Sequence, residues 1–493
     1  MGTLLAATSA TRCYYHSKPF QSFVMKEARV SNFDATWWQT WPVDIRVDTS
    51  LTGSWLPKDR SVLQTWVARK ATEARVQYNG TLSPVIAEFQ EVISRHPELE
   101  KLGNAMFTEV PNKSPYNETP DGKPSLQNFT DFLVVLDHII KQGPEFSNSK
   151  DPPTAPSVIG FPINAILDWP MGTLSGYDFF LSPIVNTQLH NVLSQWSKYL
   201  ASPASQSVLN GWLAPTGKAA IAASANTGKT NYTFEQLFAC PDTSAPYLGF
   251  TSWDEYFVRR FNDGIRPTAA PDDEASDCGY PDPTLVIDNA CESAPLQVKH
   301  NVSFYDNFYL KEQPYSLVNM LNFAPEAHSF VGGTVYQAYL SALSYHRWHA
   351  PVSGKILKIE HIPGTYYSEN VFYGLAGNQT APDPGAPDYS QPYISAVATR
   401  AVVYIQARNP KIGMMAIVFI GMAEVSSCEF TVKEGDEIVK GQEIGMFHYG
   451  GSSHCLLFQP GVELDFVHPP PWDSSDVDTE KTFHVRSALA VVS

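Results

Sequence analysis

The chain has 493 residues, of which 43% are hydrophobic and 17% charged, and its formal net charge is −16. This length predicts two or three domains, and the acidic balance argues against a nucleic-acid partner, which requires a basic face. The most apolar run, Met414 to Val425, has about a dozen residues, whereas a membrane span needs roughly 20. We therefore expect no stable membrane anchor. The six cysteines form no CxxC pair, which favours reduced thiols, a cytoplasmic protein and no metal site.

The first half of the chain shows helical periodicity after an irregular leader, residues 1–60. The stretch SPVIAEFQEVISRH predicts a helix with Ser83 as its N-cap and Pro84 at the first helical position. FTDFLVVLDHIIKQGP predicts a second, buried helix that ends by Gly143, and SPIVNTQLHNVLSQWSKYL predicts a third with one apolar stripe. Residues 61–235 are therefore interpreted as a helical accessory domain.

The second half, residues 236–493, has short extended runs separated by glycine turns. TSWDEYFVRRF predicts a short helix near its start. KIGMMAIVFIGMAEVSSCEFTV predicts two buried strands with a break near Gly421, and VKEGDEIVKGQEIGMF places Gly435 and Gly441 in turns. The phrases APVSGKI and EGDEIVKGQEIG resemble swinging-arm carrier modules, so barrel-sandwich-like strands are expected. The expected fold class is α+β, with the helical domain preceding a β-rich core.

Two histidines lie three residues apart in the stretch YHRWHAP. His346 and His349 would share one face of a helix but not of a strand. Imidazole titrates near working pH, so the pair can supply a general base and a second proton carrier. The alternative is an ordinary structural pair beside Trp348. A metal site would need a third ligand, which the sequence does not identify.

The stretch GMFHYGGSSHCLLF places two glycines and two serines between apolar runs. The simpler interpretation is a flexible turn between two strands. The other is a bond that the protein cuts in itself. With His349 as the base that activates it, Ser452 Oγ would attack the Gly451 carbonyl carbon. Elimination of the resulting ester would leave dehydroalanine, and hydration would give a pyruvoyl group at position 452.

Three motifs together, YHRWHAPVSG, KGQEIGMFHYGGSS and FVRRFNDGIRP, resemble the phosphatidylserine decarboxylase family of self-cleaving pyruvoyl enzymes. They occur in the family's order over residues 250–493. NACES, FIGMAEVSSCE and GMFHYGGSS are similar to a narrower branch, the fungal soluble decarboxylases that include the L-tryptophan decarboxylase of psilocybin biosynthesis. The helical first half is similar to the accessory domain of that branch.

The resemblance implies roles for individual residues. Ser452 matches the serine that becomes the pyruvoyl group, and Gly451 matches the residue left at the new C-terminus. His349 matches the histidine of the self-cleaving triad, and His346 matches its companion, which is linked to decarboxylation.

The triad aspartate is the departure from the family pattern. The family's Asp-Gly pair is replaced by the run Cys291-Glu292-Ser293. Glu292 is the tentative carboxylate that orients His349, and Asp288 or a bound cation is the alternative.

The activity implied is decarboxylation of a free, aromatic, tryptophan-like L-amino acid. Its amine would form a Schiff base with the pyruvoyl group. Loss of CO2 would then produce a carbanion that delocalises into the imine. His346 would then return a proton to the α-carbon. Phosphatidylserine is the second candidate substrate, and an inactive family member that serves as a binding protein is the third possibility. The expected enzyme has two chains after cleavage, with its oligomeric state left open.

Overall fold

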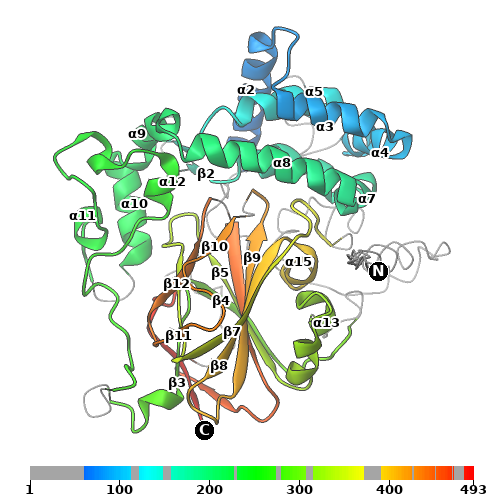
Figure 1. Ribbon diagram of the computed structural model, residues 1–493. Coiled ribbons are helices and arrows are strands. Elements are labelled where there is room, and N and C mark those ends of the chain that lie inside the picture. The colour runs from blue at the N-terminus through cyan, green and yellow to red at the C-terminus, as the bar shows by residue number, and fades with distance from the viewer. Residues whose placement is uncertain are drawn as a thin grey trace, which may run out of the picture. The chain divides into compact units, whose positions relative to one another are not determined.

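The computed structural model describes most of the chain beyond the predicted leader, of which only Arg60 is included. The described residues are 60–112, 122–147, 157–226, 230–273, 279–306, 315–370, 390–424, 427–449, 451–468, 470 and 482–493. Residues 48–493 belong to a single unit. Figure 1 shows most of its helices at one end of the sheets, with α13 and α15 beside the strands.

The described chain from Arg60 to Phe257 is mainly helical. Its helices are α2 (Arg60–Gln77), α3 (Pro84–Ser94), α4 (Pro97–Thr108), α5 (Phe129–Ile139), α6 (Pro162–Leu167), α7 (Leu174–Leu181), α8 (Pro183–Leu200), α9 (Leu209–Trp212), α10 (Pro215–Ala225), α11 (Phe234–Leu237) and α12 (Trp253–Phe257). A two-stranded antiparallel hairpin, β1 (Glu145–Ser147) with β2 (Ser157–Ile159), interrupts them. The 3-10 helices are η3 (Pro170–Gly172), η4 (Pro203–Val208), η5 (Pro246–Gly249), η6 (Pro283–Leu285) and η7 (Pro325–Phe330).

The helices begin where the sequence predicts. α3 and α8 follow the N-cap residues Ser83 and Ser182, each with proline in the first turn. Proline fits there because its missing N–H would have no partner within the helix. α5 has Asn128 as its N-cap, and the Asn128 side chain accepts a hydrogen bond from Asp131 N–H. α5 is buried on nearly all sides, as expected of a central helix, and α2, α3 and α4 pack around it.

The second half of the chain forms antiparallel sheets, which confirms the α+β class. The widest sheet has seven strands in the described residues, in the order β11-β7-β8-β9-β13-β5-β4. Its strands are β4 (Ala294–His300), β5 (Thr334–Leu340), β7 (Gly354–Ile362), β8 (Arg400–Ala407), β9 (Met414–Met422), β11 (Glu437–Ile438) and β13 (Gly451–Phe458).

Two further sheets each have three strands in the part of the chain that is described. One has the order β10-β12-β6, from β10 (Cys428–Phe430), β12 (Glu443–Phe447) and β6 (Arg347–His349). The other has the order β14-β15-β3, from β14 (Leu464–Phe466), β15 (Ala488–Val492) and β3 (Val286–Asp288). α13 (Leu317–Met320) and α15 (Gln391–Val397) pack together, and α15 contacts β9 (Figure 1).

Glycine turns and an aromatic stack set how the sheets meet. Gly435 and Gly441 have φ of 88° and 80°, so the predicted turns are present at positions where glycine is the least strained residue. The predicted break near Gly421 falls just beyond it, because β9 extends to Met422. Trp348 of β6 stacks on Phe419 of β9 with ring centroids 3.7 Å apart and an interplanar angle of 8°. This contact joins the three-stranded sheet to the seven-stranded one.

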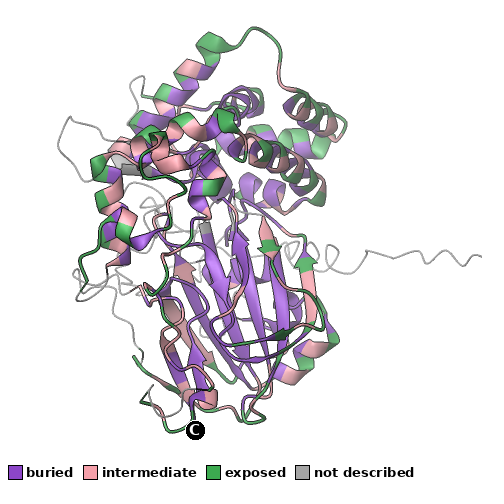
Figure 2. Ribbon diagram, turned by 60° about the vertical axis from the view of Figure 1, so that its left-hand side comes forward, coloured by how far each residue is buried: buried purple, intermediate pink, exposed green. Residues whose placement is uncertain are grey.

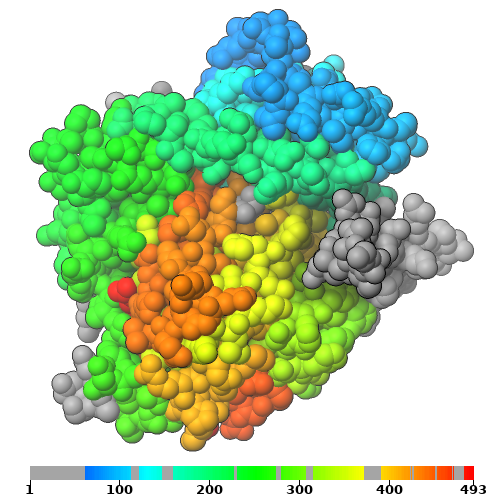
Figure 3. Space-filling model, viewed as in Figure 1, coloured from blue at the N-terminus to red at the C-terminus, as the bar shows by residue number. Residues whose placement is uncertain are grey.

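The helices share a hydrophobic core with the end of the sheet at which β9 ends and β13 begins. Tyr366, Tyr367, Ala423 and Tyr449 belong to the same buried cluster as the helical side chains. Figure 2 shows the strands buried along most of their length, and Figure 3 shows the blue-green and green helical segments bordering the yellow and orange strand segments. Of the helices that are described, none is both long and apolar enough to cross a bilayer.

Candidate active site

Ser452 lies at the start of a central strand rather than in a flexible turn. β13 pairs with β5 and β9, which places Ser452 opposite Leu340 and Gly421. Its side chain is fully buried, and its Oγ has no hydrogen-bond partner among the described residues. Buried hydroxyls are normally paired, so an exception needs an explanation. One explanation is that the hydroxyl takes part in a reaction.

The alternation of side chains along the strands decides what Ser452 faces. Ser452 and His454 point to one side of β13, and His454 lies opposite Phe419 of β9. Directly opposite residues share a face, so Ser452 is on the same side of the sheet as Phe419. Trp348 stacks on that side. Ser452 therefore faces the space between the two sheets.

His346 immediately precedes β6 and is fully buried. Its carbonyl accepts a hydrogen bond from Phe447 N–H, which continues the β12–β6 ladder, so His346 falls on the same side of β6 as Trp348. Its ring stacks on Phe257 of α12, with centroids 4.1 Å apart. Burial, and then the charge of Arg259, lower the pKa of His346 well below its usual value. The ring is therefore neutral near pH 7.

His349 lies on the opposite side of β6 from Trp348, so the two histidines do not share a face. Its Nε2 is 2.9 Å from the Tyr345 hydroxyl, its Nδ1 is 2.8 Å from the Gly441 carbonyl oxygen, and Arg486 Nε is 3.0 Å from Nδ1. Burial, and then Arg486, lower the pKa of His349 to about 3. The ring is a neutral imidazole with both nitrogens occupied, and no hydrogen bond joins it to Ser452 in the described structure.

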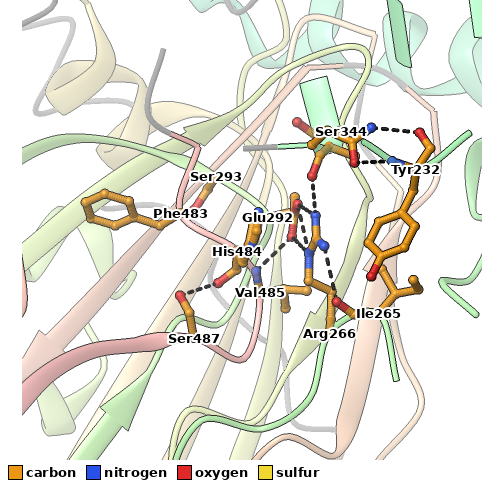
Figure 4. Close-up of polar contacts among 12 residues, drawn as sticks. Tyr232, Ile265, Arg266, Glu292, Ser293, Ser344, Phe483, His484, Val485 and Ser487 are labelled. Atoms are coloured by element: carbon orange, nitrogen blue, oxygen red, sulfur yellow. Dashed lines mark hydrogen bonds and ion pairs between the residues drawn. The ribbon is translucent and has the colours of Figure 1, made fainter. Parts of the chain in front are cut away.

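Glu292 is buried and bound to other groups than His349 (Figure 4). Its carboxylate accepts hydrogen bonds from Arg266 Nε at 3.0 and 3.2 Å and from Arg266 Nη2 at 2.5 Å. It also accepts the Val485 N–H at 2.8 Å. Val485 precedes Arg486, which contacts His349 Nδ1. Glu292 therefore holds the segment that carries Arg486, and it does not hold the imidazole itself.

Asp288, the alternative carboxylate, also makes no hydrogen bond to the His349 ring, whose partners are Tyr345, Gly441 and Arg486. Asp288 is fully buried, and burial raises the pKa of its carboxyl to about 7. The part of the chain that is described holds no group of three or more His, Cys, Asp or Glu side chains arranged to bind a metal ion.

Sequence reasoning missed three residues at these histidines and at the start of β13: Tyr345, Arg486 and Glu424. Tyr345 was inside the quoted histidine motif, and its hydroxyl was the available signal. Glu424 was inside FIGMAEVSSCE, which was used only as a likeness. Arg486 had no local signal, because it reaches His349 from 137 residues away in the chain. Its φ of 68° is visible only in the structure.

Glu292→Gln is expected to destabilise the protein and to slow any self-cleavage. Removing the charge leaves the buried Arg266 guanidinium without its carboxylate, a loss of roughly 3–5 kcal/mol for such a pair. It also weakens the anchor of the Arg486 segment. The measurements are the urea midpoint of unfolding and the rate at which the two fragments appear on a gel.

The double variant Arg266→Met with Glu292→Met separates stability from positioning. Removing both charges is expected to recover stability, but the acceptor for Val485 N–H stays absent, so cleavage stays slow. If Glu292→Gln cleaves at the parent rate, Glu292 has no part in orienting His349.

His454 is expected to make stability depend on pH. It is fully buried, and burial lowers its pKa to about 3. The unfolded state therefore binds a proton below about pH 6.5 that the folded state does not, so this contribution is present above pH 6.5 and is lost as the pH falls. Going from pH 7 to pH 5 removes about 2 kcal/mol of unfolding free energy per histidine of this type.

Burial raises the pKa of Asp288 to about 7 and of Glu424 to about 8, and these carboxyls change the pH dependence of stability in the opposite direction. Comparing two proteins that differ only at His454 isolates the effect of the histidine. Urea unfolding would compare the Ser452→Ala protein with the same protein carrying His454→Leu. The destabilisation caused by His454→Leu should shrink by about 2 kcal/mol between pH 7 and pH 5. An identical difference at both pH values contradicts the assignment.

Comparison with known proteins shows which family the chain resembles. Two family models, both described as phosphatidylserine decarboxylase, match residues 83–221 and 253–470. The chain is 39% identical to decarboxylase iboD of Amanita muscaria (strain Koide BX008) over 369 residues, which cover 73% of this chain and 99% of that protein. It is 31% identical to the L-tryptophan decarboxylase of Psilocybe cubensis over 431 residues, 84% of this chain and 89% of the other. It is 28% identical to phosphatidylserine decarboxylase proenzyme 3 of Schizosaccharomyces pombe over 221 residues, 45% of this chain and 20% of the other.

The two family models and the relatives named as decarboxylases identify the protein as a carboxy-lyase. The chain belongs to the phosphatidylserine decarboxylase family. The likeness to fungal decarboxylases that the sequence motifs indicated is confirmed.

Proposed function

We propose that the protein is a pyruvoyl-dependent decarboxylase of a free, aromatic L-amino acid, matured by its own cleavage between Gly451 and Ser452. The observation that carries the proposal is the buried Ser452 hydroxyl, which has no partner among the described residues and stands at the start of the central strand. The family membership and the names of two fungal relatives, both L-tryptophan decarboxylases, support it. Residues 61–235 then serve as the accessory domain and 236–493 as the self-processing core.

Cleavage is a rearrangement followed by an elimination. Ser452 Oγ gives its proton to a neutral imidazole and bonds to the Gly451 carbonyl carbon. The imidazolium then gives that proton to the Ser452 nitrogen as the C–N bond breaks, which leaves an ester at Oγ and a free amine. The Ser452 Cα then loses a proton and its Cβ–O bond breaks, which releases the Gly451 carboxylate and leaves dehydroalanine. One water adds and ammonia leaves, so position 452 ends as a pyruvoyl group. The neutral state of His346 and of His349 near pH 7 suits either ring to the base step.

The residues around position 452 fit such a group. Ser452 and His346 face the same space between sheets, and Phe257 closes it beside His346. When formed, the pyruvoyl carbonyl supplies an electron sink for the electrons left by CO2. The protein's part is to exclude water and to return a proton to the α-carbon. We assign that role to His346, whose ring is neutral before the reaction and would first take up a proton in the matured enzyme.

Aromatic side chains support an aromatic substrate. Tyr449, two residues before Gly451, lies against Trp196, Trp253 and Phe257, with ring centroids 4.8, 5.9 and 5.8 Å away. These rings belong to one buried hydrophobic cluster, and an apolar environment of this kind suits an aromatic ring better than a charged lipid headgroup. Phosphatidylserine is the second candidate substrate, because both family models carry that name.

The test begins with the mass of the purified protein, which should show fragments of about 451 and 42 residues. CO2 release is then measured from tryptophan, tyrosine, phenylalanine and phosphatidylserine vesicles. Turnover of tryptophan or tyrosine with none of the vesicles is expected. Turnover of vesicles alone would assign the lipid activity, and one intact, inactive chain would make the protein a binding member of the family.

A further inference from the structure

Glu424 is a buried carboxylate that is only half satisfied. It follows β9, two residues beyond Met422, and is 4% exposed. Its Oε1 accepts the backbone N–H groups of Ile163 and Asn164 in α6, at 2.5 and 2.8 Å. Its Oε2 has no hydrogen-bond partner among the described residues. Burial raises the pKa of this carboxyl to about 8, so near pH 7 the free group holds a proton, and Oε2 becomes an acceptor once that proton leaves. A buried, ionised oxygen without a partner costs free energy unless something else supplies a donor.

A second buried polar atom near Glu424 is also without a partner in the described chain: the hydroxyl of Tyr367. Glu424 contributes to the raised pKa values of both Tyr367 and Tyr449, in each case after burial, so all three groups lie close together. Tyr449 does not satisfy the carboxylate, because its hydroxyl donates to the Gly160 carbonyl at 2.5 Å. Two unsatisfied polar atoms thus stand in an otherwise aromatic environment.

The place of Glu424 relative to the reacting bond follows from the strand register. Gly421 lies opposite Ser452 and Met422 lies opposite Gly451, so Glu424 comes just past the bond that is cut. Tyr449, which follows β12, lies near the same end of β13. The ring of Phe257 contacts both Tyr449 and His346, with centroid distances of 5.8 Å and 4.1 Å. A substrate joined at position 452 can therefore direct its side chain toward Glu424 along aromatic surfaces.

We propose that Glu424 determines substrate specificity by accepting, at Oε2, a hydrogen bond from an N–H or O–H group on the aromatic ring of the substrate. The inference rests on the proposed amino-acid decarboxylase function and narrows its substrate class to rings that carry a donor, such as indole or phenol. A site built to bind a donor rejects a ring that lacks it, because the site's own buried oxygen is then left unpaired.

Glu424→Gln tests the proposal with little change of volume. The Ile163 and Asn164 N–H groups require an acceptor, so the amide oxygen must take the place of Oε1 and the amide NH2 must take the place of Oε2. The ionised Oε2, which would accept the ring donor, is thereby replaced by an NH2 group, which can only donate. We expect kcat/KM for tryptophan to fall about 100-fold, and kcat/KM for 3-benzothienylalanine, which has sulfur in place of the indole N–H, to change less than about 3-fold. Fragment masses should match those of the parent.

The matched control is Glu326→Gln, which removes a carboxylate paired with Lys358 at 3.5 Å and should leave both substrates unchanged. The unaltered protein gives a second measurement, which does not depend on a variant folding: it should prefer tryptophan to the sulfur analogue by about 100-fold in kcat/KM. Equal use of the two substrates, or an equal loss for both in Glu424→Gln, overturns the inference while the decarboxylase function stands. Absence of CO2 release from every aromatic amino acid in the unaltered protein refutes the proposed function itself.

Discussion

Ser452→Ala is expected to leave the protein as one 493-residue chain with no measurable decarboxylase activity. The substitution removes the oxygen that attacks the Gly451 carbonyl carbon, and no other group at that position can form the ester. Because the hydroxyl makes no hydrogen bond to a described residue, its removal should cost little stability. Intact mass and the melting temperature measure the two effects separately.

Ser453→Ala is the matched control for that experiment. Ser453 is equally buried, its Oγ likewise has no partner among the described residues, and it is the next residue on the same strand. It points to the other side of the sheet, because side chains alternate along a strand. Ser453→Ala should therefore mature and react normally. Cleavage of Ser452→Ala into the parent's two fragments would refute the assigned cleavage site.

His349→Ala and His346→Ala are expected to fail at different stages. The family resemblance predicts that His349→Ala stays a single chain, because the base is missing, whereas His346→Ala cuts itself but decarboxylates at least about 100-fold more slowly. Fragment masses report the first step, and CO2 release from the matured protein reports the second. Added imidazole should restore part of the lost step in each variant if the ring acts as an acid or base rather than as packing.

The geometry makes this a demanding test of the division of labour. His346 is on the side of β6 that faces Ser452, whereas both ring nitrogens of His349 contact Tyr345, Gly441 and Arg486. Cleavage by His349 therefore requires its ring to leave those partners. An intact chain in His346→Ala together with two fragments in His349→Ala would exchange the roles of the two histidines.

Glu292 could be picked out from the sequence as a candidate site residue, but its hydrogen-bond partners could not. The missing Asp-Gly pair marked Cys291-Glu292-Ser293 as unusual, and Glu292 is indeed buried near the histidines' strand. Its hydrogen-bond partners are Arg266 and Val485, and Val485 is 193 residues away in the chain. Nothing local in the sequence specifies such a contact, and an acidic side chain next to a motif gives no direction for its carboxylate.

Features that depend on neighbouring residues could be predicted from the sequence. Serine followed by proline and a 3.6-residue apolar period predicted the starts of α3 and α8, because caps and periodicity act within one or two turns. The motifs indicated the family for a similar reason, because each motif is a short run of neighbouring residues and the motifs occur in the family's order along the chain. The three-dimensional fold was needed to show that β6 turns His346 and His349 to opposite sides and that Glu292 binds Arg266. It alone showed Glu424 to be half satisfied by α6, 261 residues away. Those properties arise from strand register and from burial, which bring distant residues together and decide which polar atoms find partners.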